Sequence, residues 1–265
     1  MTATQSYENV SEVDLAYCRA ALYSALAIGF QAPTEDNLSR LLTADSRSCL
    51  AGAATTLYPS EPDILSAVEA LPDIETTSLS SLRSNYRVFF GHTAQGRITP
   101  YETEYGNEAL FQQPQELGDL MGFYRAFGLA LKREHHERPD HVSCECEFMM
   151  FLALKEAYAL EQDHQEMLAE TRKAEKLFLR DHLGRFLPAF VTGLSRGDPA
   201  GFYGRLGELG VRFVTAECAR FQVTPGATNL SLRPADDGRV PMACGNGTEC
   251  TAMTGTGIPD GGDSV

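Results

Sequence analysis

Histidine, cysteine and acidic residues gather in one stretch, residues 135–149, which reads HHERPDHVSCECEFM. Imidazole and thiolate groups bind zinc, and a cysteine in an electropositive setting can act as a nucleophile or redox centre. Carboxylates at the same place could instead pair with the basic side chains of a bound peptide. The stretch therefore indicates one of three chemistries: a metal site, a reactive thiol, or the polar edge of a peptide-binding surface.

The expected helical geometry argues against the metal site. Pro139 is expected to begin a helix or to lie just before one, and Asp140 is a natural N-cap. Consecutive helical residues are rotated by about 100°, so Cys144 and Cys146 point about 200° apart and cannot share one ion. His141 shares a face with Cys144, but that face continues as an apolar stripe. We therefore expect a core helix with a polar, functional N-terminus and no bound metal or other cofactor.

Other motifs that could carry chemistry are incomplete. GHTAQGRI at residues 91–98 has the glycine spacing of a phosphate-binding P-loop but lacks its lysine and the following Ser/Thr. A di-iron carboxylate bundle needs two Glu-x-x-His pairs, and only Glu161 and His164 form one. The sequence has no nucleophile elbow, dinucleotide-binding glycine motif or zincin motif. These observations favour a binding protein over an enzyme.

One alternative from another class stays open. Cys144 and Cys146 could act together with Cys244 and Cys250 of the glycine-rich C-terminal region, either around a metal or as redox-sensing thiols. The chain has seven cysteines, an odd and widely spread set, which fits reduced thiols better than a disulfide framework.

The overall composition limits the partners. A formal charge of −14 and a pI of about 4.8 predict repulsion from nucleic acid and from anionic lipid, and attraction to a basic peptide. No segment approaches the ~18–20 apolar residues of a membrane span, and the first residues, MTATQSYENVSEVD, lack the features of a secretory signal. We therefore expect a cytoplasmic protein with no nucleic-acid partner and no membrane span.

Apolar residues recur at three- and four-residue spacing along most of the chain, which predicts helices and no strand. The first helix is expected to begin at Ser11, with Asp14 completing a capping box, and to end at Gly29. Further helices are expected near residues 35–44, 46–57, 61–71, 78–90, 114–131, 140–161, 163–183 and 199–221.

Two regions depart from the regular helical pattern. Gly118, Gly122 and Gly128 interrupt the helix near 114–131, where close packing or a kink is expected to offset their cost. The last 42 residues hold eight glycines and four prolines, the composition of a disordered tail. The sequence thus predicts an all-α fold: one bundle-like domain of about nine or ten helices over residues 1–223, followed by a flexible tail over residues 224–265.

Two pairs of motifs resemble a known family. The first pair is YRVFFG at residues 86–91 and TPYETEY at 99–105; the second is ERPDH at 137–141 and ECEFM at 145–149. In this order and spacing, they resemble the motifs of the TorD/DmsD/NarJ family of redox-enzyme maturation chaperones, over roughly residues 10–220. The motifs differ from the family's in two places, Tyr101 for a frequent tryptophan and Thr103 for serine.

The resemblance implies a single TorD-like α-helical domain without catalytic activity. Members of the family bind the twin-arginine leader, or another N-terminal segment, of a molybdenum-cofactor enzyme's apo catalytic subunit until the cofactor is in place. Some members form domain-swapped dimers, so a homodimer is one expected state. The motif residues that the resemblance assigns to the peptide-binding site are Pro100, Tyr101, Tyr105, Glu137, Pro139, Asp140 and His141.

A receptor for a twin-arginine leader needs carboxylates beside an aromatic or apolar groove. The side chains that meet this need are the acids Glu102, Glu104, Asp140 and Glu145 and the aromatics Tyr101, Tyr105 and Phe148. We expect Asp140 and His141 on one exposed turn, where Asp140 faces a leader arginine, His141 titrates near neutrality, and both contribute more to binding than to stability. The structural alternative is that Asp140 caps its helix, His141 bonds a loop carbonyl, and the tyrosines are core.

Overall fold

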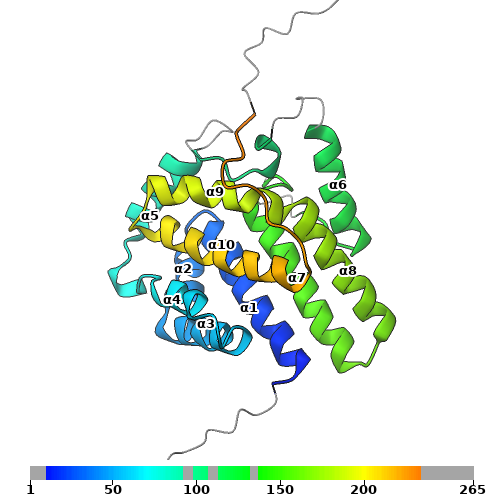
Figure 1. The fold of residues 1–265 in the computed structure, drawn as a ribbon. Helices are drawn as coiled ribbons and strands as arrows, with labels where there is room; N and C mark the ends of the chain where they lie inside the picture. The colour runs from blue at the N-terminus through cyan, green and yellow to red at the C-terminus, as the bar shows by residue number, and fades with distance from the viewer. Residues whose placement is uncertain (1–9, 92–97, 107–112, 132–136, 234–265) are drawn as a thin grey trace, which may run out of the picture. The chain divides into compact units, whose positions relative to one another are not determined.

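The computed structural model describes residues 10–91, 98–106, 113–131 and 137–233 (Figure 1). They belong to the first of two units into which the chain divides, Met1–Arg233; the second, Pro234–Val265, lies outside the described residues. The described part has ten α-helices, two 3-10 helices and no strand beyond isolated bridges, which confirms the all-α fold. The elements are α1 (Glu12–Phe30), α2 (Glu35–Leu42), α3 (Ala44–Leu57), α4 (Pro62–Glu69), η1 (Ile74–Thr76), α5 (Leu79–Phe90), η2 (Glu102–Glu104), α6 (Gln113–Ala126), α7 (Val142–Glu161), α8 (Gln165–Asp181), α9 (Leu183–Gly197) and α10 (Phe202–Arg220).

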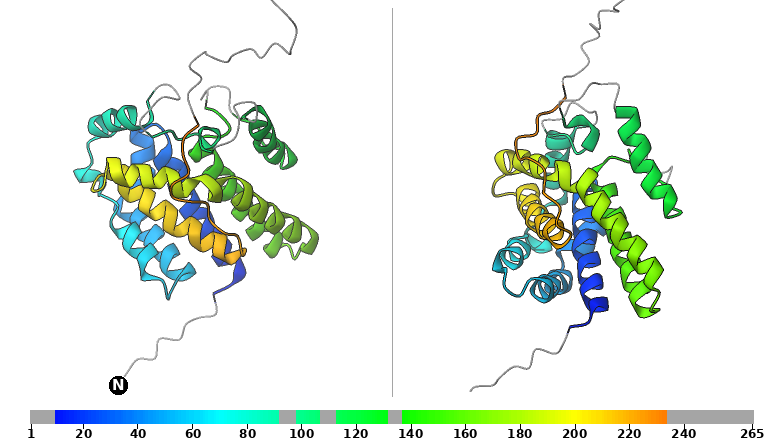
Figure 2. Two further views of the ribbon diagram at one scale, coloured as in Figure 1. Left: turned by 45° about the horizontal axis from the view of Figure 1, so that its top comes forward. Right: turned by 45° about the vertical axis from the view of Figure 1, so that its right-hand side comes forward.

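Helix α1 lies at the centre of the helices, where it packs along α7 and also contacts α3 and α10 (Figures 1 and 2). Its start is the predicted capping box. The Asp14 amide donates to the Ser11 hydroxyl at 3.1 Å, and the Ser11 amide donates to the Asp14 carboxylate at 3.3 Å. These bonds satisfy amides that the first helical turn leaves without a partner.

Among the described helices, α1 alone is long and apolar enough to cross a membrane, with a mean hydropathy of 1.3. The expectation that no segment approaches such a composition is therefore wrong for α1. Of the residues in its most apolar window, 56% are buried inside the protein. Helix α1 thus has the surroundings of a core helix, and its apolar character is used to pack α7.

A buried group of charged side chains ties four helices together. Glu156 of α7 is fully buried and accepts hydrogen bonds from Arg19 of α1 at 2.5 Å and from Arg172 of α8 at 2.6 Å. Arg220 of α10 lies 3.5 Å from Glu156 and 3.0 Å from the buried Glu175 of α8. Because buried charges are stable only when they are paired, this group fixes how the four helices meet.

Helix α9 was not predicted, because the helices expected at 163–183 and 199–221 leave residues 184–198 between them. Pro188 lies inside it and has no amide hydrogen for the carbonyl of Gly184, one turn earlier. That carbonyl instead accepts the Gly226 amide at 2.9 Å. A Cβ on Gly226 would lie 1.8 Å from the carbonyl oxygen of Arg185, so the approach requires glycine. A segment distant in the sequence therefore supplies the hydrogen bond that Pro188 cannot donate inside α9.

Helix α6 lies at the edge of the helices in both views of Figure 2 and packs loosely. It ends at Ala126 instead of near residue 131, and Gly128 follows with a φ of 73°, the left-handed conformation typical of helix ends. At Gly118 and Gly122, no neighbouring element comes within 4 Å of the place that a Cβ would take. The expectation of close packing at these glycines is therefore wrong.

The chain beyond α10 stays in contact with the helices as far as Arg233. Val223 is buried, Gly226 bonds α9, and Arg233 is only 6% exposed. This segment, orange in Figure 1, runs back across α9. The contacts extend ten residues past the boundary expected after residue 223, so we propose a boundary after Arg233. The rest of the expected flexible tail, residues 234–265, lies outside the described residues.

Candidate peptide-binding site

The loop around η2 and the start of α7 are far apart in the sequence and lie side by side in the fold. Tyr101 and His141 form an isolated antiparallel bridge. In it, the Glu102 amide donates to the Asp140 carbonyl at 2.9 Å, and the first amide of α7 donates to the carbonyl of Pro100 at 2.8 Å. Backbone hydrogen bonds therefore join the two motifs into one site.

Arg138, the second residue of the ERPDH motif, lies at the centre of the candidate site. It donates to the two carboxylate oxygens of Asp140 at 3.0 and 2.8 Å and to Glu104 at 3.2 Å. Its guanidinium also lies over the ring of Tyr101, 4.3 Å from the centroid. Two carboxylates and an aromatic ring around a guanidinium are the arrangement expected for an arginine of a bound peptide, but this arginine belongs to the chain itself.

Asp140 is fully buried and does not cap α7. Besides Arg138, its carboxylate accepts the amide and the hydroxyl of Thr103, at 3.3 and 2.7 Å. The expectation that Asp140 lies on an exposed turn is therefore wrong, and so is the alternative in which it is the N-cap. Asp140 instead fixes the η2 loop against the start of α7.

His141 is the N-cap of α7 and is 1% exposed. Its Nδ1 accepts the Ser143 amide at 3.2 Å and lies 2.7 Å from the Ser143 hydroxyl. Burial, and then the charge of Arg138, lowers the pKa of His141 to about 3. The expectation that His141 stands on an exposed turn and titrates near neutrality is therefore wrong; the imidazole is neutral at physiological pH.

The fold is expected to lose stability through His141 as the pH falls from about 6.5 toward 3. The unfolded chain binds the imidazole proton near pH 6.5 and the folded chain only near 3, so each pH unit in this window costs about 1.4 kcal/mol. Between pH 7 and 5, wild type should lose about 2 kcal/mol more than His141→Asn, which keeps a capping side chain. Denaturant unfolding at both pH values measures this; equal losses would contradict a buried neutral imidazole.

Glu145 lies on the buried side of the site and has no solvent exposure. Burial, and then the negative charges of Glu102 and Asp140, raises the pKa of Glu145 well above its usual value. No donor of the described chain reaches its carboxyl oxygens, but the neutral form can itself donate to Glu102. The Glu102 oxygens also lie 3.0 Å from His182 Nδ1 and 2.8 Å from an Arg185 terminal nitrogen. Glu145 therefore lies on the buried side of the η2 loop, where it can hydrogen-bond Glu102.

The predicted site residues separate into a buried and a partly exposed set. The buried residues are Tyr105, Asp140, His141 and Glu145; the partly exposed ones are Tyr101, Glu104, Glu137 and Pro139. Tyr105 donates to the Thr99 carbonyl at 2.9 Å and packs against Phe186, which is the core role weighed as its alternative. Tyr101 instead donates to Glu137 at 3.2 Å. We call the partly exposed residues Tyr101, Glu104, Glu137 and Arg138 the motif surface.

A cavity of about 620 Å³ lies beside η2, between α6 and the junction of α8 with α9. Its lining is Glu102, Glu116, Gly118, Asp119, Gly122, Phe123, Ala126, Asp181, His182 and Arg185. The wall combines ionisable side chains with potential charges of both signs and apolar surface from Phe123 and Ala126. Gly118 and Gly122 of α6 leave room on one side. Glu104 of the η2 loop thus belongs to the motif surface, whereas Glu102 of the same loop lines the cavity.

Three site residues were not found from the sequence. Arg138 was not assigned to the site, although a basic residue between Glu137 and Asp140 is itself a signal of local ion pairs. His182 and Arg185 reach Glu102 from 80 and 83 residues further along the chain. No spacing in the sequence indicates that contact, because it depends on how α9 packs.

The described residues contain no group of three or more His, Cys, Asp or Glu side chains that could hold a metal ion. Cys146 is buried and Cys144 is half-buried. Burial, and then Glu137 and Glu147, raises the pKa of Cys144 to about 12, and burial raises the pKa of Cys146 as well. Both thiols are therefore poorly suited to form reactive thiolates. Cys244 and Cys250 of the alternative reading lie outside the described residues.

Comparison with known proteins agrees with the motifs. The family model described as nitrate reductase delta subunit matches residues 61–192. The chaperone protein TorD of Vibrio cholerae is 24% identical over 74% of this chain and 88% of its own length, and the perchlorate reductase assembly chaperone protein of Dechloromonas aromatica is 27% identical over 78% and 91%. The selenate reductase assembly chaperone protein of Thauera selenatis is 40% identical over 35% of this chain and 48% of its own.

No solved structure matches the chain significantly. The relatives carry the names of chaperones, not of enzymes. Their similarity extends over most of the chain, and the two motifs lie side by side in the fold. The chain belongs to the nitrate reductase delta subunit family, which includes the TorD-like chaperones.

Proposed function

We propose that the chain is a cytoplasmic chaperone for the assembly of a molybdenum-cofactor reductase. It binds the twin-arginine leader, or another N-terminal segment, of the apo catalytic subunit and holds that subunit until the cofactor is inserted. Family membership supports the assembly role, since relatives are named as assembly chaperones of perchlorate, selenate and chlorate reductases.

The observation that carries the proposal is the motif surface around Arg138. It combines the carboxylates of Glu104 and Glu137 with the ring of Tyr101, and it already holds one guanidinium. Charge-assisted hydrogen bonds and cation–π contacts are the interactions that recognise arginine. The same groups can receive an arginine of a bound leader, either beside Arg138 or in its place.

The charge of the whole chain supports a basic ligand. A formal charge of −14 creates a negative potential that attracts a cationic peptide and raises its association rate. At 0.1 M salt, this attraction is largely screened at distances beyond about 10 Å. The association rate is therefore expected to fall with ionic strength, while the contacts at the motif surface set the dissociation rate.

A synthetic leader peptide, with two adjacent arginines and an apolar stretch after them, is expected to bind the purified protein. Glu104→Gln and Tyr101→Ala should each weaken binding by roughly 1–3 kcal/mol, or about 5- to 150-fold in Kd, because each removes a charged or cation–π contact to an arginine. Isothermal titration at one fixed, low salt concentration measures the three affinities.

Glu147→Gln is the matched control, since Glu147 is exposed on α7 outside the motif surface and its replacement removes the same charge. This control should bind as wild type does. A peptide with lysines in place of both arginines should bind more weakly, because lysine cannot form the paired hydrogen bonds of a guanidinium. The proposal fails if wild type binds no leader peptide and recovers no reductase subunit from a cytoplasmic extract.

A further inference from the structure

The end of the described chain pairs with the η2 loop through an isolated bridge. The Gly106 amide donates to the Ser231 carbonyl at 2.9 Å, and the Arg233 amide donates to the Glu104 carbonyl at 2.8 Å. Between these two bonds, Tyr105 and Leu232 form an antiparallel bridge. An extended peptide that adds to the edge of a binding site makes the same kind of backbone bonds. Residues 229–233 therefore lie on the candidate site as a peptide ligand would.

This segment also presents an arginine to an acid. The Arg233 guanidinium lies 2.6 Å from the carboxylate of Glu116 on α6, and the side chain of Arg233 is 1% exposed. Its backbone amide is at the same time bound to Glu104, whose side chain contacts Arg138 on the motif surface. The segment thus places a second guanidinium, paired with Glu116, at a strand position bonded to the η2 loop.

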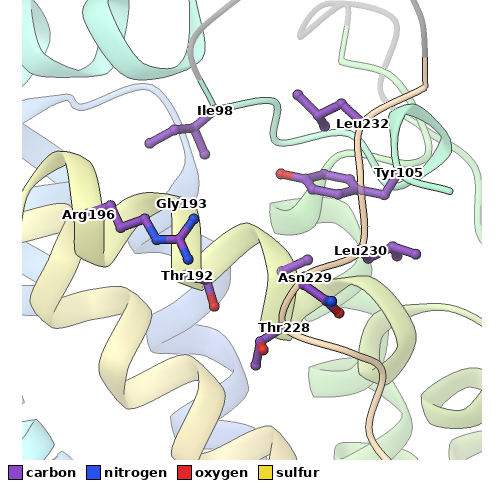
Figure 3. A pocket seen from close by; sticks show the side chains of 10 residues that line it. Ile98, Tyr105, Thr192, Gly193, Arg196, Thr228, Asn229, Leu230 and Leu232 are labelled. Carbon is purple, nitrogen blue, oxygen red and sulfur yellow. The ribbon is translucent and has the colours of Figure 1, made fainter.

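The segment fills its place incompletely. A cavity of about 270 Å³ remains next to it, lined by Leu230 and Leu232 of the segment and, on the other side, by Ile98, Tyr105 and Gly193 (Figure 3). Leu232 is 47% exposed, so it anchors the strand weakly. Backbone bonds and the ion pair of Arg233 with Glu116 contribute to holding the segment in place, together with the partly buried Leu230. Such contacts are readily exchanged for equivalent ones from another extended chain.

We propose that residues 229–233 are an internal occupant of the client-binding surface, which an arginine-containing client segment displaces. The proposal rests on the proposed function, and it extends the client-binding surface from the motif surface, through Glu104, to Gly106 and Glu116. The backbone of Glu104 and Gly106 and the carboxylate of Glu116 bind the internal strand in the free protein and the client strand in the complex. Because the occupant is tethered to α10, its effective concentration is high, and only a segment that offers equivalent backbone and arginine contacts replaces it.

The test compares wild type, Arg233→Ala and Arg40→Ala in titrations with the twin-arginine leader peptide. Arg40 is exposed on α2, so its variant changes the net charge equally without touching the site. We expect Arg233→Ala to bind the peptide about tenfold more tightly than wild type and Arg40→Ala to match wild type. A residue that only supports the structure would leave the affinity unchanged or weaken it. Either of these results for Arg233→Ala overturns the inference while the proposed function stands.

Hydrogen exchange of the unaltered protein gives a second readout, which does not depend on how the variant folds. The Arg233 amide is bonded to the Glu104 carbonyl in the free protein and should exchange at least tenfold faster when the leader peptide saturates the site. Unchanged protection of this amide in a peptide complex overturns the inference. Failure of every variant, including Arg233→Ala, to bind the peptide overturns the proposed function, and the inference with it.

Discussion

Replacing Glu156 with alanine is expected to lower the free energy of unfolding by about 3–5 kcal/mol, the usual cost of removing one partner of a buried ion pair. Arg19 has a side chain only 6% exposed and would lose its partner, and Arg172 and Arg220 would each lose a contact. Burial alone would raise the pKa of Glu156, but the charges of Arg19 and Arg220 outweigh it and lower that pKa. The Glu156 carboxylate is therefore charged in the folded protein, and its removal takes a full negative charge from the three arginines.

Thermal unfolding should show the loss as a fall of roughly 10 °C in Tm. Asp63→Ala is the control: Asp63 pairs with Arg212 at 2.7 Å, but its side chain is 74% exposed, so its removal should change Tm little. If Glu156→Ala and Asp63→Ala unfold at the same temperature, the buried charges do not hold α1, α7, α8 and α10 together.

Asp140→Asn is expected to lower the free energy of unfolding by about 2–3 kcal/mol. The variant removes the nearer of the two carboxylate charges that pair with the Arg138 guanidinium, and it weakens the bonds to Thr103 that fix the η2 loop. The Arg138 side chain is 34% exposed, so water offsets part of the cost and the loss stays below that at Glu156. This expectation reverses the hypothesis drawn from the sequence, in which Asp140 matters more for binding than for stability.

Denaturant unfolding and peptide titration of the same samples separate the two roles. Glu137→Gln removes the same charge from a half-buried position in the same motif and should cost less than 1 kcal/mol of stability. Should Asp140→Asn unfold as wild type does and yet lose the leader peptide, the sequence-based hypothesis would be right and the structural role assigned to Asp140 would be wrong.

Most helices could be predicted because their apolar spacing and their caps are local signals. The capping box of Ser11 and Asp14 was found in this way. Helix α9 was missed because Pro188 is a strong local signal against a helix, whereas the bond from Gly226 that compensates for it comes from a distant segment. The same limit applies to the boundary after residue 223, since glycine-rich composition does not reveal that Arg233 reaches Glu116.

The proximity of the two motifs could be predicted, but the burial of their residues could not. The motif order indicated that residues near 101 and 140 lie together, and the bridge between Tyr101 and His141 agrees. A polar motif at a helix start was interpreted as exposed, because Asp and His are usually found at the surface. Here Arg138 supplies the counter-charge that allows Asp140 to be buried, and its own charge helps to keep His141 neutral.

The pairing of α1 with α7 has a consequence for the synthesis of the protein itself. About 110 residues of chain separate the end of α1 from the start of α7, which at ~5–20 residues per second take roughly 5 to 20 s to translate. During that interval the most apolar helix of the chain has been made but not the helix that it packs against most extensively. A nascent chain of this family member is therefore expected to expose the apolar surface of α1 during that interval, which favours aggregation.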